Sequence, residues 1–272
     1  MSELLPEALR RLGGRGAAED EEGGFVAYLP DLEEVESFVE EARREMESFT
    51  GTSSLDLSWR WQEHEEWEET WRRGFQPRRV TERLVVSPSW VDPKPGPGEL
   101  VITLDPGVAF GTGEHPTTRG SLRLLDRVVE PGTRWADVGA GSGILAIALA
   151  RLGASHVLAV EPDPLACTAA AENLSTNGVE AVVELLHAQA TPDLLDRVGP
   201  FDGIASNIEC GVILSLLGAY RRALAPEGEL VVSGILHHEV EGFLQEARRL
   251  GLHLTDEDRE EEWWSGHLRI QD

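Results

Sequence analysis

The sequence predicts an α/β protein in which a mainly parallel sheet carries helices on both faces and a small α+β domain precedes it. Extended and helical segments alternate along most of the chain, which is typical of a parallel sheet with helical crossovers. One of these strands runs directly into a glycine-rich turn and a helix. The first part of the chain lacks this alternation and ends in a charged, tryptophan-containing segment, so we predict that it forms a separate unit.

Residues 1–60 are predicted to form the small α+β domain. Glu3–Leu12 is expected to be a helix, and Gly24–Leu29 is expected to be a strand. Asp31 can cap a second helix, because apolar residues recur at helical spacing after it. Leu55–Trp61 alternates apolar and polar residues, which indicates a half-buried strand.

Residues 61–74 are predicted to form a short linker helix. Trp67 and Trp71 are four residues apart and therefore share one helix face. Packing against a neighbouring domain is the expected role of these two side chains, in preference to ligand binding. The remaining residues, 75–272, are expected to form the second, larger domain.

Strands and helices alternate through residues 75–272. The strands Leu84–Val86 and Glu99–Leu104 are separated by a Pro/Gly-rich loop at 91–98. From the next glycine-rich loop onward we predict, in order, helix Thr117–Val129, a strand at Trp135, a helix from Gly143, strand His156–Val160, helix Pro164–Thr176, a strand at Val182, strand Phe201–Ser206, helix Val212–Leu224, strand Glu229–Ser233, helix Glu239–Leu250 and two terminal strands.

The turn after the strand at Trp135 reads Asp137-Val138-Gly139-Ala140-Gly141-Ser142-Gly143. Glycine at Gly139, Gly141 and Gly143 lets the backbone approach a nucleotide-like ligand where any Cβ would collide. Because Ile144 follows the third glycine, the Gly-x-Gly-x-x-Gly fingerprint of dinucleotide-binding proteins is not completed. A nicotinamide-dependent dehydrogenase is therefore disfavoured.

The next predicted strand ends in a carboxylate, Glu161. A carboxylate in this place can accept hydrogen bonds from both ribose hydroxyls of an adenosine. Open α/β sheets bind ligands at the carboxyl ends of their strands, where both the glycine turn and Glu161 fall. The combination indicates S-adenosylmethionine as the cofactor.

Two further elements are expected at the same edge of the sheet. The loop Asp105–Thr118 combines several glycines with phenylalanine, histidine and threonine, which favours a ligand cover over a mere connector. Its His115 is a candidate proton acceptor or a loop-stabilising residue. The strand from Phe201 leads to Asn207, whose amide can accept a hydrogen bond from a substrate amine and orient its lone pair.

Composition excludes several classes of protein. The net charge is -25, and Lys94 is the only lysine, so the surface disfavours nucleic acid and favours a cationic partner; adaptation to high salt would give the same composition. No apolar run approaches the roughly 20 residues that span a bilayer, so we expect a cytoplasmic protein without membrane contact. Cys167 and Cys210 are expected to be reduced thiols, and the adjacent His237 and His238 are expected to lie on the surface, not at a metal.

These motifs, in this order, resemble the bacterial methyltransferases of large-subunit ribosomal protein L11. The string from Phe110 to Thr118 is the most specific part, and the glycine turn, Glu161, Asn207 and the tryptophan-containing linker also match. The family usually has aspartate at the position of Glu161. Its first domain begins with a strand before the first helix, whereas Glu3–Leu12 is predicted here to be that helix already.

The resemblance implies a Rossmann-like class I methyltransferase fold and trimethylation of amino groups on the protein substrate L11. The expected partner is therefore ribosomal protein L11, and the enzyme is expected to act as a monomer. A methyltransferase for RNA, a small molecule or another protein, and a non-catalytic cofactor-binding protein, are the alternatives. The resemblance implies cofactor contacts at Thr118, Gly139, Glu161 and Asn207. We further expect cofactor contacts at Gly141, Gly143, Phe110 and Gly111, with Asn207 as the catalytic residue and no metal.

Overall fold

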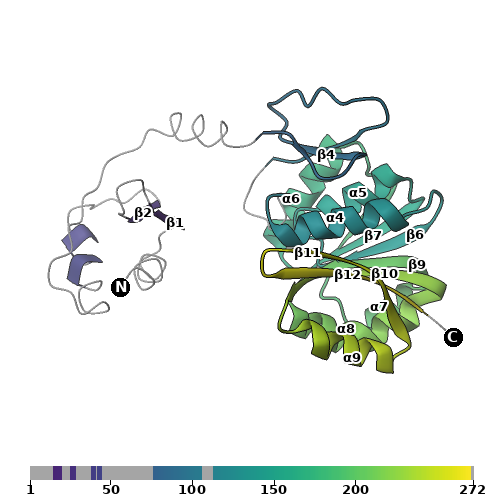
Figure 1. The fold of residues 1–272 in the computed structure, drawn as a ribbon. Helices are drawn as coiled ribbons and strands as arrows, with labels where there is room; N and C mark the ends of the chain where they lie inside the picture. The colour runs from purple at the N-terminus through teal and green to yellow at the C-terminus, as the bar shows by residue number, and fades with distance from the viewer. Residues whose placement is uncertain are drawn as a thin grey trace. The chain divides into compact units, whose positions relative to one another are not determined.

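The computed structural model describes residues 15–19, 25–28, 38–40, 42–44, 76–105 and 113–270 (Figure 1). The chain divides into two compact units, Met1–Trp71 and Arg72–Asp272. No helix in the described ranges has both the length and the apolar composition needed to cross a bilayer.

In the first unit, β1 (Arg15–Glu19) pairs antiparallel with β2 (Phe25–Tyr28). β2 confirms the strand expected at 24–29, whereas no strand was expected at β1. Residues 38–40 and 42–44 are helical, as expected for the helix that follows Asp31. The helix predicted at 3–12, the strand at 55–61 and the linker helix at 61–74 lie outside the described residues.

The second unit is built on a seven-stranded sheet with the order β11-β12-β10-β9-β6-β7-β8. The five strands from β10 to β8 are parallel, and β12 runs antiparallel to both β10 and β11. The mainly parallel sheet is therefore confirmed, with an antiparallel hairpin at one edge. The strands are β6 (Arg134–Val138), β7 (His156–Glu161), β8 (Val183–His187), β9 (Phe201–Asn207), β10 (Leu224–Leu236), β11 (Leu252–Glu260) and β12 (Trp263–Ile270).

Helices cover both faces of this sheet (Figure 1). The α4, α5 and α6 helices lie on one face, and α7, α8 and α9 lie on the other. All the predicted helices of this unit are confirmed, while α7 was not predicted, because it is short and its apolar pattern covers barely two turns. The helices are α4 (Pro116–Val128), α5 (Ile144–Leu152), α6 (Pro164–Thr176), α7 (Pro192–Val198), α8 (Cys210–Ala223) and α9 (Val240–Arg249).

Successive side chains of each central strand point to opposite faces, so the sheet separates two hydrophobic cores. On β6, Ala136 and Val138 pack with α7, α8 and α9, whereas Trp135 packs with α4 and α5. Strand β10 behaves in the same way, with Val232 in the first core and Val231 in the second. A strand buried on both faces carries a nearly continuous apolar run, as these do.

A three-stranded sheet of β3 (Arg78–Arg79), β4 (Leu84–Ser87) and β5 (Leu100–Thr103) leads into the loop that begins at Asp105. Its last strand is fixed by Asn177, a buried residue at the end of α6. The Asn177 Oδ1 accepts from the Thr103 N–H at 2.9 Å, and its Nδ2 donates to the Thr103 carbonyl at 2.7 Å. The side-chain amide thus pairs with β5 as a neighbouring strand would, and it fixes where the following loop starts.

Candidate functional site

The turn between β6 and α5 adopts the left-handed backbone that the glycines predicted. Gly139, Gly141 and Gly143 have φ values of 79°, 54° and 81°. A Cβ on Gly139 would lie 2.2 Å from the Cγ2 of Ile208, which follows β9. The neighbouring strand β7 supports the turn, because the Val160 carbonyl accepts from the Gly139 N–H at 2.9 Å. The glycine thus permits a close approach between the ends of β6 and β9.

Asp137 lies near the end of β6, just before this turn, and is completely buried. Its Oδ2 accepts from the Ala146 N–H of α5 at 2.9 Å, but no described residue donates to its Oδ1. Burial, and secondarily the charge of Glu161, raises the pKa of Asp137 from 3.8 to about 7. A buried acceptor without a donor is the kind of group that a polar ligand can satisfy. The sequence motif included Asp137, but its role was not predicted.

Glu161 ends β7 and is tied to the glycine turn. Its Oε2 accepts from the Gly141 N–H at 2.8 Å, and its Oε1 accepts from the Asp163 N–H at 2.9 Å. Each carboxylate oxygen can accept a second hydrogen bond, so the two backbone donors orient the group without exhausting it. The predicted proximity of the glycine turn and Glu161 is therefore present in the structure.

Asn207 ends β9 and faces the start of α4. Its Nδ2 donates to the Oγ1 of Thr118 at 3.5 Å, which leaves the amide oxygen as the acceptor end. The preceding Ser206 is buried; its Oγ donates to the Val138 carbonyl at 3.1 Å and lies 3.0 Å from the Tyr220 hydroxyl. These bonds fix β9 against β6, and neither Ser206 nor Tyr220 was predicted to matter.

His115 caps α4. Its Nδ1 accepts from the Thr117 N–H at 3.4 Å and lies 2.7 Å from the Thr117 hydroxyl. The ring packs edge-on against Trp263, with 5.1 Å between the centroids. Burial, followed by the nearby Arg119 charge, lowers the pKa of His115, which favours the neutral ring that a cap requires. Of the two roles considered for His115, the structure therefore shows the one that stabilises the loop.

The structure brings together most of the predicted site residues. Gly139, Gly141, Gly143, Glu161 and Asn207 lie at the carboxyl ends of adjacent strands, and Thr118 contacts Asn207. Phe110 and Gly111 fall in the part of the loop that lies outside the described residues. Open α/β sheets bind ligands at this edge.

Other candidate groups lie apart from this edge or have no ligand chemistry. Both cysteines are free thiols, and burial raises the pKa of Cys210 to about 11, so it is unreactive at neutral pH. Within the described ranges there is no group of three or more histidine, cysteine or acidic side chains that could hold a metal.

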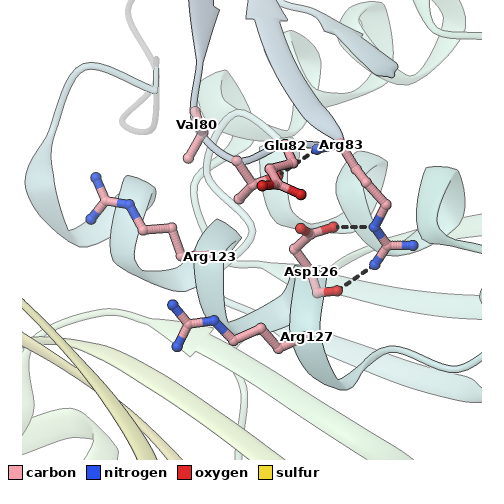
Figure 2. Close-up of a pocket in the computed structure, with 7 residues that line it drawn as sticks. Val80, Glu82, Arg83, Arg123, Asp126 and Arg127 are labelled. Carbon is pink, nitrogen blue, oxygen red and sulfur yellow. Dashed lines mark hydrogen bonds and ion pairs between the residues drawn. The ribbon is translucent and has the colours of Figure 1, made fainter. Parts of the chain in front are cut away.

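A surface hollow of about 440 Å³ lies between the β3–β4 connection and the last turns of α4. Figure 2 shows the residues that line it. Its arginines are already paired: Arg83 with Asp126 at 2.8 Å and Arg127 with Asp256 at 2.6 Å. Arg127 is roughly 13 Å along the helix axis from Thr118. The hollow therefore belongs to the structural surface of α4 and not to the candidate site.

Comparison with known proteins gives one consistent family. The family model described as "Ribosomal protein L11 methyltransferase (PrmA)" matches residues 14–270. The ribosomal protein L11 methyltransferase of Symbiobacterium thermophilum is 40% identical over 249 residues, covering 91% of this chain and 80% of that protein. The one from Pelotomaculum thermopropionicum is 42% identical over 208 residues, covering 76% of this chain and 66% of that protein.

The fold has a counterpart among solved structures. A crystal structure of ribosomal protein L11 methylase from Lactobacillus delbrueckii subsp. bulgaricus matches with a TM-score of 0.65 and 32% identity. The match covers 73% of this chain and 100% of that one.

The buried Asp137 gives a pH-dependent prediction. Because burial raises its pKa from 3.8 to about 7, the folded protein holds a proton that the unfolded chain has already lost, and stability falls as pH rises toward 7. Asp137→Asn removes this pH-dependent loss of stability. We expect the free energy of unfolding of the variant, relative to the wild type, to rise by about 3 kcal/mol between pH 5 and pH 8. Urea unfolding at both pH values measures it, and a pH-independent difference would contradict the burial argument.

The close approach at Gly139 gives a second prediction. Gly139→Ala should destabilise the protein by about 1 to 3 kcal/mol more than Gly132→Ala. Both positions have positive φ, but a Cβ on Gly132 meets nothing within 4 Å. Denaturant unfolding compares the two variants. The excess cost should largely disappear in an Ile208→Ala background; if it persists there, the contact with Ile208 is not its cause.

Proposed function

Because the chain belongs to the ribosomal protein L11 methyltransferase family, we propose that it transfers methyl groups from S-adenosylmethionine to lysine and N-terminal amino groups of ribosomal protein L11. The observation that supports this most is the meeting of three features at one sheet edge. These are the glycine turn at Gly139, the oriented carboxylate of Glu161 and the amide of Asn207. The proposal includes a cytoplasmic reaction and a monomeric enzyme.

The residues present fit the cofactor. The glycine turn offers backbone without side chains, and Glu161 retains acceptor capacity for the two ribose hydroxyls. The unpaired Oδ1 of Asp137 is a further polar atom behind the same turn. When bound, S-adenosylmethionine supplies an electrophilic methyl group on a cationic sulfonium.

Asn207 is the residue proposed to act on the substrate. Its Nδ2 is directed to Thr118, so its Oδ1 can accept a hydrogen bond from an amine and fix the direction of the nitrogen lone pair. The amine must be neutral to act as a nucleophile, and exclusion of water favours the neutral form. Orientation and desolvation are therefore the main tasks of this site, and no strong general base is required.

The charge of the chain supports a cationic protein substrate. With 49 acidic residues against 24 lysines and arginines, the surface attracts a basic partner and repels the phosphate backbone of free RNA. The RNA-methyltransferase alternative is accordingly disfavoured.

We further propose that residues 1–60 recognise the protein substrate, that residues 61–74 link the two parts and that residues 75–272 carry the reaction. The division of the chain after Trp71 supports separate units. The glycine turn, Glu161 and Asn207 all lie in the second unit, which leaves recognition of a folded partner as a task for the first.

The proposed chemistry is tested by separating cofactor binding from methyl transfer. Asn207→Ala should lower kcat on purified L11 by on the order of 100-fold, because a misoriented nucleophile loses its near-attack geometry. Its cofactor affinity, measured by calorimetry, should fall much less. Glu161→Ala is the matched control and should lose cofactor affinity first. Equal losses of binding and turnover in Asn207→Ala would make Asn207 a cofactor ligand only.

The division of labour is tested by removing residues 1–71. The remaining chain should bind the cofactor as the full chain does, because the proposed binding residues all lie beyond the cut. Methylation of intact L11 at saturating cofactor should be lost or strongly reduced. Full activity of the truncated enzyme on intact L11 would show that recognition lies in the catalytic unit.

A further inference from the structure

Three arginines of α4 and three acidic residues of β11 form a ladder of ion pairs. Arg119 pairs with Glu260, Arg123 with Asp258 and Glu260, and Arg127 with Asp256. We call these six residues the arginine–acid ladder. Arginines four residues apart on a helix are about 6 Å apart along its axis, and alternate strand residues are about 6.7 Å apart. The two spacings match, so every rung can form at once.

The rung at the start of α4 differs from the others. Arg119 is 8% exposed. Its Nε donates to Glu260 at 3.0 Å, and its guanidinium also donates to the Glu114 carbonyl. By contrast, the last rung, between Arg127 and Asp256, has exposed side chains on both partners. Water weakens an exposed ion pair far more than a buried one. The Arg119–Glu260 rung should therefore do the most to fix the orientation of α4.

The β11–β12 hairpin and the neighbouring β10 contact the start of α4 at further points. Trp263 packs against His115, the cap of the helix. Ser233 on β10 donates to the Thr117 carbonyl at 3.1 Å and lies 2.7 Å from the Ser265 hydroxyl of β12. Gly120 fits so tightly that a Cβ there would lie 2.3 Å from the Ser265 Oγ. The first turn of α4 is therefore held by the terminal strands, more than 100 residues away in sequence.

Thr118 lies inside this clamped turn, and it holds the Asn207 amide. We propose that Glu260 and Trp263 are positioning residues for methyl transfer, because they fix the first turn of α4 and thereby the Thr118–Asn207 contact that orients the amide oxygen. This inference rests on the proposed role of Asn207. The guanidinium of Arg119 lowers the pKa of Glu260, so the carboxylate stays charged at neutral pH.

The test compares Glu260→Gln with Asp256→Asn. Each substitution neutralises one acid of the same ladder, but only the first lies beside the clamped turn. We expect Glu260→Gln to lower kcat for L11 methylation roughly tenfold and to leave the calorimetric cofactor Kd within about twofold of the wild type. Asp256→Asn should leave both within about twofold, and Glu260→Asp should recover part of the lost kcat.

A double-mutant cycle separates positioning from general stability. If Glu260 acts through Asn207, Glu260→Gln should lower kcat no further in an Asn207→Ala background. Losses of kcat that multiply in the double variant would overturn the inference, as would equal effects of Glu260→Gln and Asp256→Asn on kcat. If the wild type itself fails to methylate L11, the proposed function has failed instead.

A second variant covers the case in which Glu260→Gln does not fold. Trp263→Leu removes the ring contact with His115 and leaves the ladder in place. It should lower kcat with little change in cofactor Kd, and again show no further loss in the Asn207→Ala background. Folding is checked by thermal melting, and a folded Trp263→Leu enzyme with wild-type kcat would contradict the inference.

Discussion

The candidate site depends on how closely the ends of β6 and β9 approach each other. Ile208 occupies the space that a side chain at Gly139 would need. The Ser206 hydroxyl donates a hydrogen bond to the carbonyl of Val138, the residue that precedes Gly139. Because Asn207 lies between these two contacts, its position is fixed by packing on both sides. Gly139 therefore has two effects. It leaves the backbone accessible to a ligand, and it lets the end of β9 come near enough to supply the Asn207 amide.

Negative charge on the carboxylates of this site is energetically unfavourable, and the surrounding fold must offset that cost. Asp137 is buried beside Glu161, and burial, with a smaller contribution from the Glu161 charge, raises its pKa to about 7, so a charged carboxylate is unfavourable there. The backbone donors at Gly141, Asp163 and Ala146 compensate part of that cost. Sites that keep an incompletely satisfied polar group in the absence of ligand are typically binding sites, since the ligand supplies the missing partner.

The helix that faces Asn207 takes its position from the end of the chain. The sheet supports α4 through Ser233, and the hairpin adds the ladder and the contact between Trp263 and His115. The ladder was visible in the sequence as arginines at every fourth position and acids at every second position. It could not be paired from the sequence, because nothing local indicates that α4 and β11 are neighbours.

The sequence by itself determined the α/β class, nearly every element of the second unit and the placement of the glycine turn, Glu161 and Asn207 at strand ends. These follow from local periodicity and from the steric freedom of glycine, which act within a few residues. Only the tertiary structure decided that Gly139 meets Ile208, that Ser206 and Tyr220 brace β9, that Asp137 keeps a proton near neutral pH and that Glu260 reaches Arg119. Each of these depends on distance and burial between segments remote in sequence, and the short α7 likewise gave too little local pattern to be recognised.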